Sequence, residues 1–371
     1  MNSEHFKKIL IIATRQIGDT LITTPLIQRT HEIWPNAKID FLGFSSAIGI
    51  LQGNPFLHQI ISSSPRPSAK EYFTLIKKIF FQYDLAIITQ PSDRAYLYGL
   101  FAASTRVGTC HPGKEDHGWK KWVTSHQVPI DYFSQHVVTE KLKLLEPFIN
   151  DHHVSKEIYI TPPTADDIPQ DLDGISDDCV VIHPSPLNDY KCWPIASWIG
   201  LIEYLSSKEI PVVISGGPIE KDKALAKSII SQLSIHAQQT TIDMTGKLSF
   251  SELAHVLHDA KAFIGVDTSI THLAAACNTP TIALFGATPP TNFGPWPNGS
   301  SSAQPYALRA MTQTVKNVTI LQGPGDCVPC RKAGCDDTSN SRSICLEELD
   351  VQRVIQALSN IEQHVIPIKH I

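Results

Sequence analysis

The sequence predicts an α/β protein made of two Rossmann-like domains. Apolar runs alternate with helical patterns in both halves of the chain, and a proline-marked stretch separates the halves. The length of 371 residues suits two or three domains. Continuous apolar strands separated by helices are typical of a parallel sheet covered on both faces. We expect a first domain over residues 1–165 and a second over residues 176–371.

The first half opens with an apolar run that is expected to be a buried strand. Residues 9–13 form this run, and a helical pattern at 21–33 follows Gly18 and stops before Pro35. Further strands are expected at 38–43, 60–62, 85–89 and 106–108, and a longer helix at 135–149. Each later strand follows a stretch that can be helical, so the strands are expected to run parallel.

A change in composition marks the domain boundary. Residues 161–178 hold Pro162, Pro163 and Pro169 with several Asp and few large apolar residues, as linkers do. The alternation then restarts, with strands expected at 179–183, 212–215, 262–266 and 281–285 and helices at 195–206, 221–233, 250–260 and 269–277. The last helix is expected to pack back on the first domain. Two such domains facing each other place strand ends and helix starts at a cleft between them, where ligands bind.

Bulk properties restrict the class of protein. The net charge of -5 argues against a nucleic-acid partner, because such proteins usually carry a basic excess. The apolar run at 9–13, followed by Arg15, is too short for a signal peptide, and no stretch approaches the roughly 20 apolar residues of a membrane span. We therefore expect a cytoplasmic protein.

The segment 263–286 carries the strongest site pattern. An apolar strand ends at Asp267, and Thr268 and Ser269 then open a helix rich in small residues. The unpaired N–H groups and the dipole at such a helix start suit a diphosphate, and Asp267 suits a sugar hydroxyl. His272, one turn further on, can face the cleft as a further donor-binding residue, and a core position is its alternative. For Asp267 and Thr268 the alternative is capping of the helix.

The loop before the helix at 195–206 carries Lys191 and Ser185. A lysine facing a cleft can neutralise the charge that builds on a leaving phosphate, and a serine hydroxyl can donate to it. Glu220 follows Gly216–Gly217 at another strand end and can hold a nucleotide ribose. A solvated lysine and an ordinary acidic first turn are the alternatives.

Asp19 lies where the turn after the first strand meets a helix. The turn has a single glycine, so it is not a dinucleotide fingerprint. A carboxylate in this place suits a general base that takes a proton from an acceptor hydroxyl. N-capping of the helix by Asp19 is the alternative.

Four cysteines crowd into one glycine-bearing polar loop: Cys327, Cys330, Cys335 and Cys345. Their spacing suits a tetrahedral thiolate site for zinc or iron. Such a site would be structural, because four protein ligands leave no open position for a substrate. Reduced, unliganded thiols or occasional disulfides are the alternative.

Taken together, these segments resemble glycosyltransferase family 9, the ADP-heptose:lipopolysaccharide heptosyltransferases. The resemblance covers most of the chain and is closest to the branch that adds the third heptose, through HPSPLNDYKCWP, GVDTSITHLAAA and LFGATPPTNFGPW. It implies a GT-B fold and inversion at the anomeric carbon without a catalytic metal. It also implies roles for six residues: Asp19 as general base, Lys191 at the departing ADP, Glu220 at the ribose, Asp267 at the heptose, and Thr268 and Ser269 at the phosphates.

The acceptor is expected on the first domain. Residues 109–128 carry Lys114, Lys120 and Lys121 beside two tryptophans, and Arg66, Lys70, Lys77 and Lys78 add further positive charge. Such residues suit a phosphorylated glycolipid at the anionic inner face of the inner membrane, where the enzyme would be peripheral. A solvated loop is the alternative.

The predicted function is transfer of heptose from ADP-heptose to a lipopolysaccharide core acceptor. A protein O-heptosyltransferase of the same family is one alternative, and a nucleotide-sugar epimerase on a similar fold is another. A non-catalytic binder is disfavoured, since the sequence keeps Asp19, Lys191 and Asp267 together.

Overall fold

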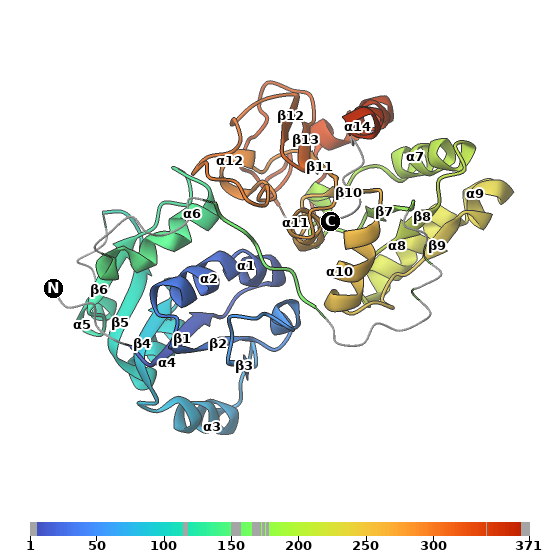
Figure 1. Ribbon diagram of the computed structural model, residues 1–371. Coiled ribbons are helices and arrows are strands. Elements are labelled where there is room, and N and C mark those ends of the chain that lie inside the picture. The colour runs from blue at the N-terminus through green and yellow to red at the C-terminus, as the bar shows by residue number, and fades with distance from the viewer. Residues whose placement is uncertain are drawn as a thin grey trace. The chain divides into compact units, whose positions relative to one another are not determined.

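The computed structural model describes residues 6–113, 118–149, 157–164, 172, 175, 178–338 and 340–364. The chain forms two compact units, Met1–Thr164 with Gly299–Ala303 and Ala165–Asn298 with Gln304–Ile371. Each unit is a mainly parallel sheet with helices (Figure 1). The predicted α/β class is therefore confirmed.

The sheet of the first unit has the order β3-β2-β1-β4-β5-β6, and all its strand pairs are parallel. Its strands are β1 (Lys8–Ala13), β2 (Lys38–Phe44), β3 (Gln59–Ser63), β4 (Tyr83–Ile88), β5 (Ala103–Cys110) and β6 (His126–Pro129). Its helices are α1 (Ile17–Leu21), α2 (Thr24–Ile33), α3 (Ala69–Ile79), α4 (Asp93–Ala102), α5 (Trp119–Trp122) and α6 (Val137–Leu142), with 3-10 turns η1 (Ile48–Leu51) and η2 (Lys143–Phe148).

Proline explains where two predicted helices differ from the structure. The helix expected at 21–33 is two helices, because Pro25 has no N–H and its ring would meet the carbonyl of Leu21. Pro25 instead lies in the first turn of α2, where a proline is tolerated. The helix expected at 135–149 likewise changes to the 3-10 turn η2, which contains Pro147.

The sheet of the second unit has the order β12-β13-β11-β10-β7-β8-β9. Only the β12–β13 pair is antiparallel among the strand pairs of the described residues. Its strands are β7 (Val180–His183), β8 (Val212–Ile214), β9 (Thr241–Asp243), β10 (Ala262–Val266), β11 (Thr281–Phe285), β12 (Thr312–Val315) and β13 (Val318–Gln322). Its helices are α7 (Ile195–Ser207), α8 (Glu220–Ile230), α9 (Ile235–Gln239), α10 (Phe250–Asp259), α11 (Ser269–Ala276), α12 (Pro290–Phe293), α13 (Ile344–Glu347) and α14 (Val351–His364), with the 3-10 turn η4 (Asp189–Lys191).

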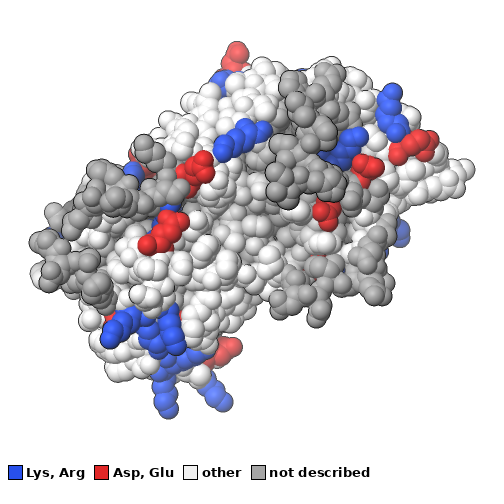
Figure 2. Space-filling model, viewed as in Figure 1, with Lys and Arg blue, Asp and Glu red and all other residues white. Residues whose placement is uncertain are grey.

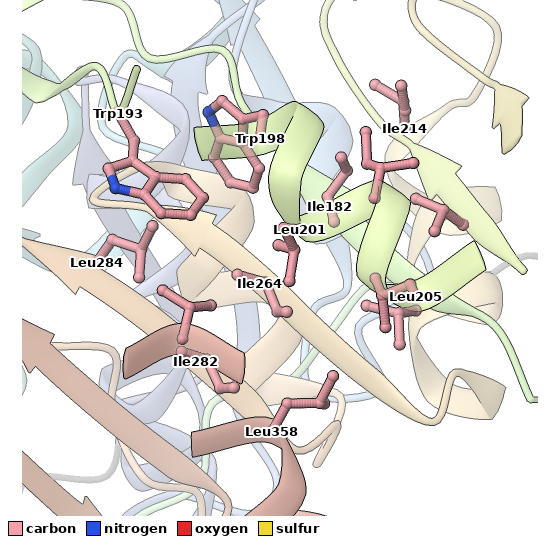
Figure 3. Close-up of a cluster of buried hydrophobic side chains, with 14 of the residues drawn as sticks. Ile182, Trp193, Trp198, Leu201, Leu205, Ile214, Ile264, Ile282, Leu284 and Leu358 are labelled. Atoms are coloured by element: carbon pink, nitrogen blue, oxygen red, sulfur yellow. The ribbon is translucent and has the colours of Figure 1, made fainter. Parts of the chain in front are cut away.

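The core of the second unit fills the space between the sheet and the helices α7 and α14 (Figure 3). Trp198 is fully buried and meets Trp193 edge to face, with ring centroids 4.8 Å apart. Leu358 of α14 belongs to the same cluster. The apolar face of α14 is buried on α7, β11 and β13, and the packing of the last helix on the first domain stays a prediction.

No helix among the described residues combines the length and the apolar character that a bilayer span requires.

Candidate functional site

The second unit carries the predicted diphosphate-binding turn at the end of β10. All five residues of β10 are buried, and Asp267 directly follows the strand. Thr268 is the N-cap of α11, because its Oγ1 accepts a hydrogen bond from the N–H of Thr271 at 3.4 Å. The N–H groups of Ser269 and Ile270 have no hydrogen-bond partner in the part of the chain described. Unpaired donors at a helix start suit a phosphate.

Lys191 and Asp267 form an ion pair within this unit. The ammonium of Lys191, at the end of η4, lies 2.6 Å from Oδ2 of Asp267. Burial opposes the charged form of both groups, yet each charge stabilises the other, so that the pKa of Asp267 is lowered and the pKa of Lys191 is raised. Lys191 is thus held at the predicted turn, which excludes the solvated-loop alternative.

Two further side chains act on the Asp267 carboxylate. A hydrogen bond from Thr288, after β11, and the electrostatic effect of His272 both favour its ionised form. His272 is 9% exposed, as expected for a histidine on the inner side of α11. The carboxylate therefore meets residues from three segments, which fixes its position at the end of β10.

The backbone that carries Lys191 is supported by the cysteine loop. Buried Ser343 donates from Oγ to the carbonyl of Tyr190 at 2.6 Å. Gly334 of the same loop has φ of 80°, and a Cβ there would lie 2.8 Å from the Cβ of Tyr190. The position of the Tyr190–Lys191 turn thus depends on contacts from a segment more than 140 residues further along the chain, as the Ser343 bond itself spans 153 residues.

Two acidic residues near the turn after β8, Asp222 and Glu220, differ in their contacts. Asp222 is buried and accepts a hydrogen bond from the N–H of Gly217 at 2.8 Å, so it fixes the turn. Glu220 is exposed at the start of α8 and has no hydrogen bond or ion pair with any described residue. Its carboxylate is therefore available to a ligand.

The end of β7 holds a buried histidine beside Ser185. The Nδ1 atom of His183 lies 3.0 Å from Oγ of Ser215, which in turn donates to the carbonyl of Ile182. Burial lowers the pKa of His183 to about 4, against opposing hydrogen bonds with Ser185 and Ser215. Ser185 itself is 8% exposed. A neutral His183 thus anchors the start of the loop that carries Ser185.

Asp19 lies in the first turn of α1, directly after β1 in the first unit. The N-cap of α1 is Gln16, so the N-capping alternative for Asp19 is wrong. Asp19 is half-buried, and its carboxylate has no hydrogen bond or ion pair with the residues that the structure describes. The carboxylate is therefore available to accept a proton.

A buried lysine supports this turn from α6. The Nζ of Lys141 donates to the carbonyl of Asp19 at 2.9 Å and to Oγ1 of Thr23 at 2.6 Å, and the residue is only 4% exposed. Burial lowers the pKa of Lys141 to about 8, and Asp19 acts in the opposite direction. Burial also raises the pKa of Tyr132 to about 12; Arg15 opposes the rise and Asp19 adds to it. The Asp19 carboxylate thus lies within electrostatic reach of an ammonium and a phenol.

The predicted acceptor lysines have different surroundings. Lys120 pairs with Asp93 at 2.8 Å and donates to the carbonyl of Pro91 at 2.6 Å, so it joins α5 to the start of α4. Lys121 is exposed. Lys114 lies outside the described residues. An acceptor role for these lysines stays a prediction.

The four predicted metal ligands are neighbours, but they do not form a closed metal site. Burial, followed by repulsion from Cys330, Cys327 and Cys335, raises the pKa of the Cys345 thiol to about 11. All four are free thiols. No group of three or more His, Cys, Asp or Glu side chains among the described residues is arranged to hold a metal. Four cysteine sulfurs are suitable ligands for zinc or iron, but here they are not arranged around a common metal position.

Two hollows in the second unit lie beside the predicted donor residues without including them. One of about 600 Å³ is bordered by Lys223, Lys227, Ile230, Ser231, Asp243, Thr245, Gly246 and Lys247. Another of about 320 Å³ is bordered by Asp189, Cys192, Trp193, Pro194, Asn340, Arg342, Ser343 and Glu347.

Sequence reasoning missed Lys141, Ser343 and Thr288. Each acts through a partner far along the chain or on another element, so spacing offers no signal for it. Only Lys141 offered any other signal, because it is a charged residue on the buried side of the short helix α6.

Comparison with known proteins gives consistent matches. The description "Glycosyltransferase family 9 (heptosyltransferase)" matches residues 73–319. Lipopolysaccharide heptosyltransferase 3 of Escherichia coli is 33% identical over 292 residues, which cover 76% of this chain and 84% of that protein.

Solved structures match in fold. E. coli heptosyltransferase WaaC with ADP has a TM-score of 0.73 at 20% identity and covers 95% of this chain and 99% of its own. The glycosyl transferase family 9 protein of Veillonella parvula has a TM-score of 0.74 at 16% identity and covers 96% and 97%. The predicted fold, two Rossmann-like domains, is confirmed by these matches.

Proposed function

Because the chain belongs to glycosyltransferase family 9, the heptosyltransferases, it is a glycosyltransferase of GT-B fold, and we propose that it transfers heptose from ADP-heptose to a lipopolysaccharide core acceptor. The observation that carries the proposal is the Lys191–Asp267 ion pair beside the open start of α11. It combines a cation and unpaired N–H groups, which a diphosphate needs, with a carboxylate that can accept from sugar hydroxyls. The relative named for this activity is E. coli lipopolysaccharide heptosyltransferase 3.

The first unit supplies the base in the proposed reaction. Asp19 accepts the proton of the acceptor hydroxyl, and the freed oxygen attacks the anomeric carbon of the heptose. The bond from that carbon to the diphosphate oxygen breaks, and its electron pair leaves with ADP. Direct displacement inverts the anomeric configuration. A carboxylate without a hydrogen-bond or ion-pair partner among the described residues, as found at Asp19, suits this role.

The second unit supplies the charge stabilisation. Negative charge grows on the diphosphate as the bond breaks, and the Lys191 ammonium and the N–H groups of Ser269 and Ile270 can receive it. Asp267 then serves two purposes, because it holds Lys191 and presents an oxygen to the heptose. Glu220 and Ser185 complete the proposed donor site at the ribose and the phosphates.

A product assay tests this function. Purified protein is incubated with ADP-heptose and core oligosaccharide, and mass spectrometry of the acceptor should show the addition of one heptose together with released ADP. Transfer to a polypeptide instead would favour the protein O-heptosyltransferase alternative. Turnover of ADP-heptose without any acceptor would favour the epimerase. Failure to bind or convert ADP-heptose would exclude all three.

The proposed place of action is the cytoplasmic face of the inner membrane, as a peripheral protein. ADP-heptose is a soluble nucleotide sugar, whereas a lipopolysaccharide acceptor is anchored in lipid. An enzyme that joins the two needs access to both phases. Fractionation of cells should recover the protein partly with membranes, and a salt wash should release it.

We also propose that the cysteine loop binds one structural zinc or iron ion through Cys327, Cys330, Cys335 and Cys345. The support is their shared loop and the mutual electrostatic effect at Cys345. Closing the site would require the loop to tighten on the ion. Elemental analysis should find about one metal per chain that Cys330→Ser with Cys335→Ser abolishes. Metal-free protein with four titratable thiols in this loop would contradict the proposal.

A further inference from the structure

We propose that residues 64–82, which hold α3 with the segments directly before and after it, form a docking surface for an anionic lipid bilayer. The proposal deepens the proposed function, because it names the surface through which an enzyme with a lipid-anchored acceptor would approach its substrate. This surface, called the aromatic-basic surface below, lies entirely on the first unit.

The first observation is the outward face of α3. The helix packs into the core of the first unit through Leu75 and Ile79. Lys70, Phe73 and Lys77 recur at intervals of three and four residues, which places them on one side of a helix, and all three are exposed. Phe73 is 71% exposed, so a large apolar ring stands in water between two cations.

The second observation is the pair of phenylalanines that ends this helix. Phe80 and Phe81 are 51% and 57% exposed, and their ring centroids lie 5.0 Å apart. The N–H of Phe81 donates to the carbonyl of Phe101 on α4 at 2.8 Å, which anchors the turn. Phe81 also has φ of 47°, in the left-handed region that a bulky residue seldom adopts. The backbone is thus held in a conformation that leaves both rings outside the core.

The third observation is the charge of the segment. Residues 64–82 contain four basic residues, Arg66, Lys70, Lys77 and Lys78, and one acidic residue, Glu71. The carboxylate of Glu71 accepts from the N–H and Oγ of Ser68 in a capping box at the start of α3. Figure 2 shows Lys and Arg side chains gathered over the part of the first unit that carries α3 in Figure 1. The surface therefore has a local positive excess, although the whole chain is acidic.

The exposed phenylalanine rings and the lysines around them together indicate that the partner is an anionic membrane surface. Exposed phenylalanines insert at the boundary of headgroups and acyl chains, while lysines around them attract anionic headgroups. Because none of the described helices can span a bilayer, contact of this kind would be peripheral. An acidic partner protein would satisfy the lysines as well, and this alternative is an outcome of the test below.

Vesicle co-sedimentation of the full chain tests the surface. Wild-type protein should bind vesicles that contain phosphatidylglycerol, should bind phosphatidylcholine vesicles far less, and should dissociate in high salt. Lys77→Gln with Lys78→Gln should lower the partition coefficient by about 30-fold, the effect expected for two cations near an anionic surface. The triple substitution Phe73→Ser, Phe80→Ser, Phe81→Asn, added to the two lysine substitutions, should lower the partition coefficient further.

Matched controls use residues away from this surface. Lys223→Gln with Lys227→Gln removes the same charge from exposed positions of α8 in the second unit, and Ile235→Ser removes an exposed apolar side chain from that unit. Both should bind vesicles like the wild type. Equal loss in the controls, or wild-type protein that stays in solution with anionic vesicles, would overturn the proposal and leave an acidic protein as the partner to seek.

Transfer to a soluble core oligosaccharide separates the two proposals. The variant Phe73→Ser, Phe80→Ser, Phe81→Asn should keep wild-type turnover on this lipid-free acceptor and an unchanged melting temperature. Vesicle binding without transfer would refute the proposed function alone, whereas transfer without vesicle binding would refute the aromatic-basic surface alone.

Discussion

The ammonium of Lys191 lies 2.6 Å from Oδ2 of Asp267, although the two residues are 76 positions apart in the sequence. The pair joins the loop after β7 to the end of β10, two neighbouring strands of the second sheet. Burial raises the cost of leaving either charge alone. Each residue therefore holds the other in place at the turn that we propose as the diphosphate and sugar site.

Removal of Lys191 should affect both donor binding and turnover. Lys191→Ala should weaken ADP binding and lower kcat by about 10²-fold, the usual effect of losing one charge-stabilising group. Isothermal titration with ADP and steady-state kinetics measure the two effects. Lys221→Ala is the matched control, because Lys221 forms an exposed ion pair with Asp189 at the same distance of 2.6 Å. Wild-type values for Lys191→Ala would show that its ammonium only stabilises Asp267.

Loss of the Asp19 carboxylate should abolish the chemical step while donor binding persists. Asp19→Asn keeps the shape of the side chain and removes the base, so kcat should fall by about 10² to 10⁴-fold. The Kd for ADP should not change, because Asp19 belongs to the first unit and the donor residues to the second. Full activity of the variant would refute the base assignment.

The sequence predicted those parts of the fold that depend on local patterns. The bounds of β10 and β11 agree with the expected strands, since each is a short apolar run between polar turns. Two helices were predicted as continuous through Pro25 and Pro147, where the ring and the missing N–H interrupt them. The sequence pattern of α14 showed that one face is buried but not that α7, β11 and β13 bury it.

The candidate site residues that the sequence indicated are those that lie near the ends of strands. Asp267 directly follows β10, Lys191 lies in the loop between β7 and α7, and Asp19 lies in the first turn of the helix after β1. Each is therefore expected near the carboxyl ends of the strands of its own sheet, the edge at which such folds usually bind ligands. Lys141 and Ser343 had no such signal. Lys141 reaches Asp19 across 122 residues, and Ser343 reaches Tyr190 across 153. Long-range contacts of this kind follow from packing, which one sequence does not reveal.

Lys141 should give the protein a pH-dependent stability that can be measured. Its folded pKa of about 8 lies below the value of 10.5 expected in the unfolded chain. The unfolded state therefore binds more protons between these values, and stability rises with pH across the window. By 1.36 kcal/mol per pKa unit, the contribution between about pH 7 and about pH 9.5 is about 2 kcal/mol.

Lys141→Met isolates this contribution. The unfolding free energy of the wild type minus that of the variant should increase by this amount over the same range, as urea titrations at several pH values would show. The difference also removes the effect of other titrating groups, such as the phenol of Tyr132, whose ionisation both proteins share. A difference that does not change with pH would mean that Lys141 keeps its proton inside the fold over this range, so that its pKa is not lowered. Lys141→Arg should retain the charge in the fold and hence lose the alkaline rise.

Ser343 should control turnover through the Tyr190 carbonyl. Ser343→Ala removes a hydrogen bond of 2.6 Å from the turn that carries Lys191, a loss of about 1 kcal/mol. We expect kcat to fall by about fivefold and the Kd for ADP to rise, with little change in thermal stability. Ser207→Ala is the matched control, because Ser207 also donates to a tyrosine carbonyl, that of Tyr204, at 2.6 Å and lies at the end of α7. A larger fall in melting temperature than in turnover would show that Ser343 stabilises the cysteine loop and does not position Lys191.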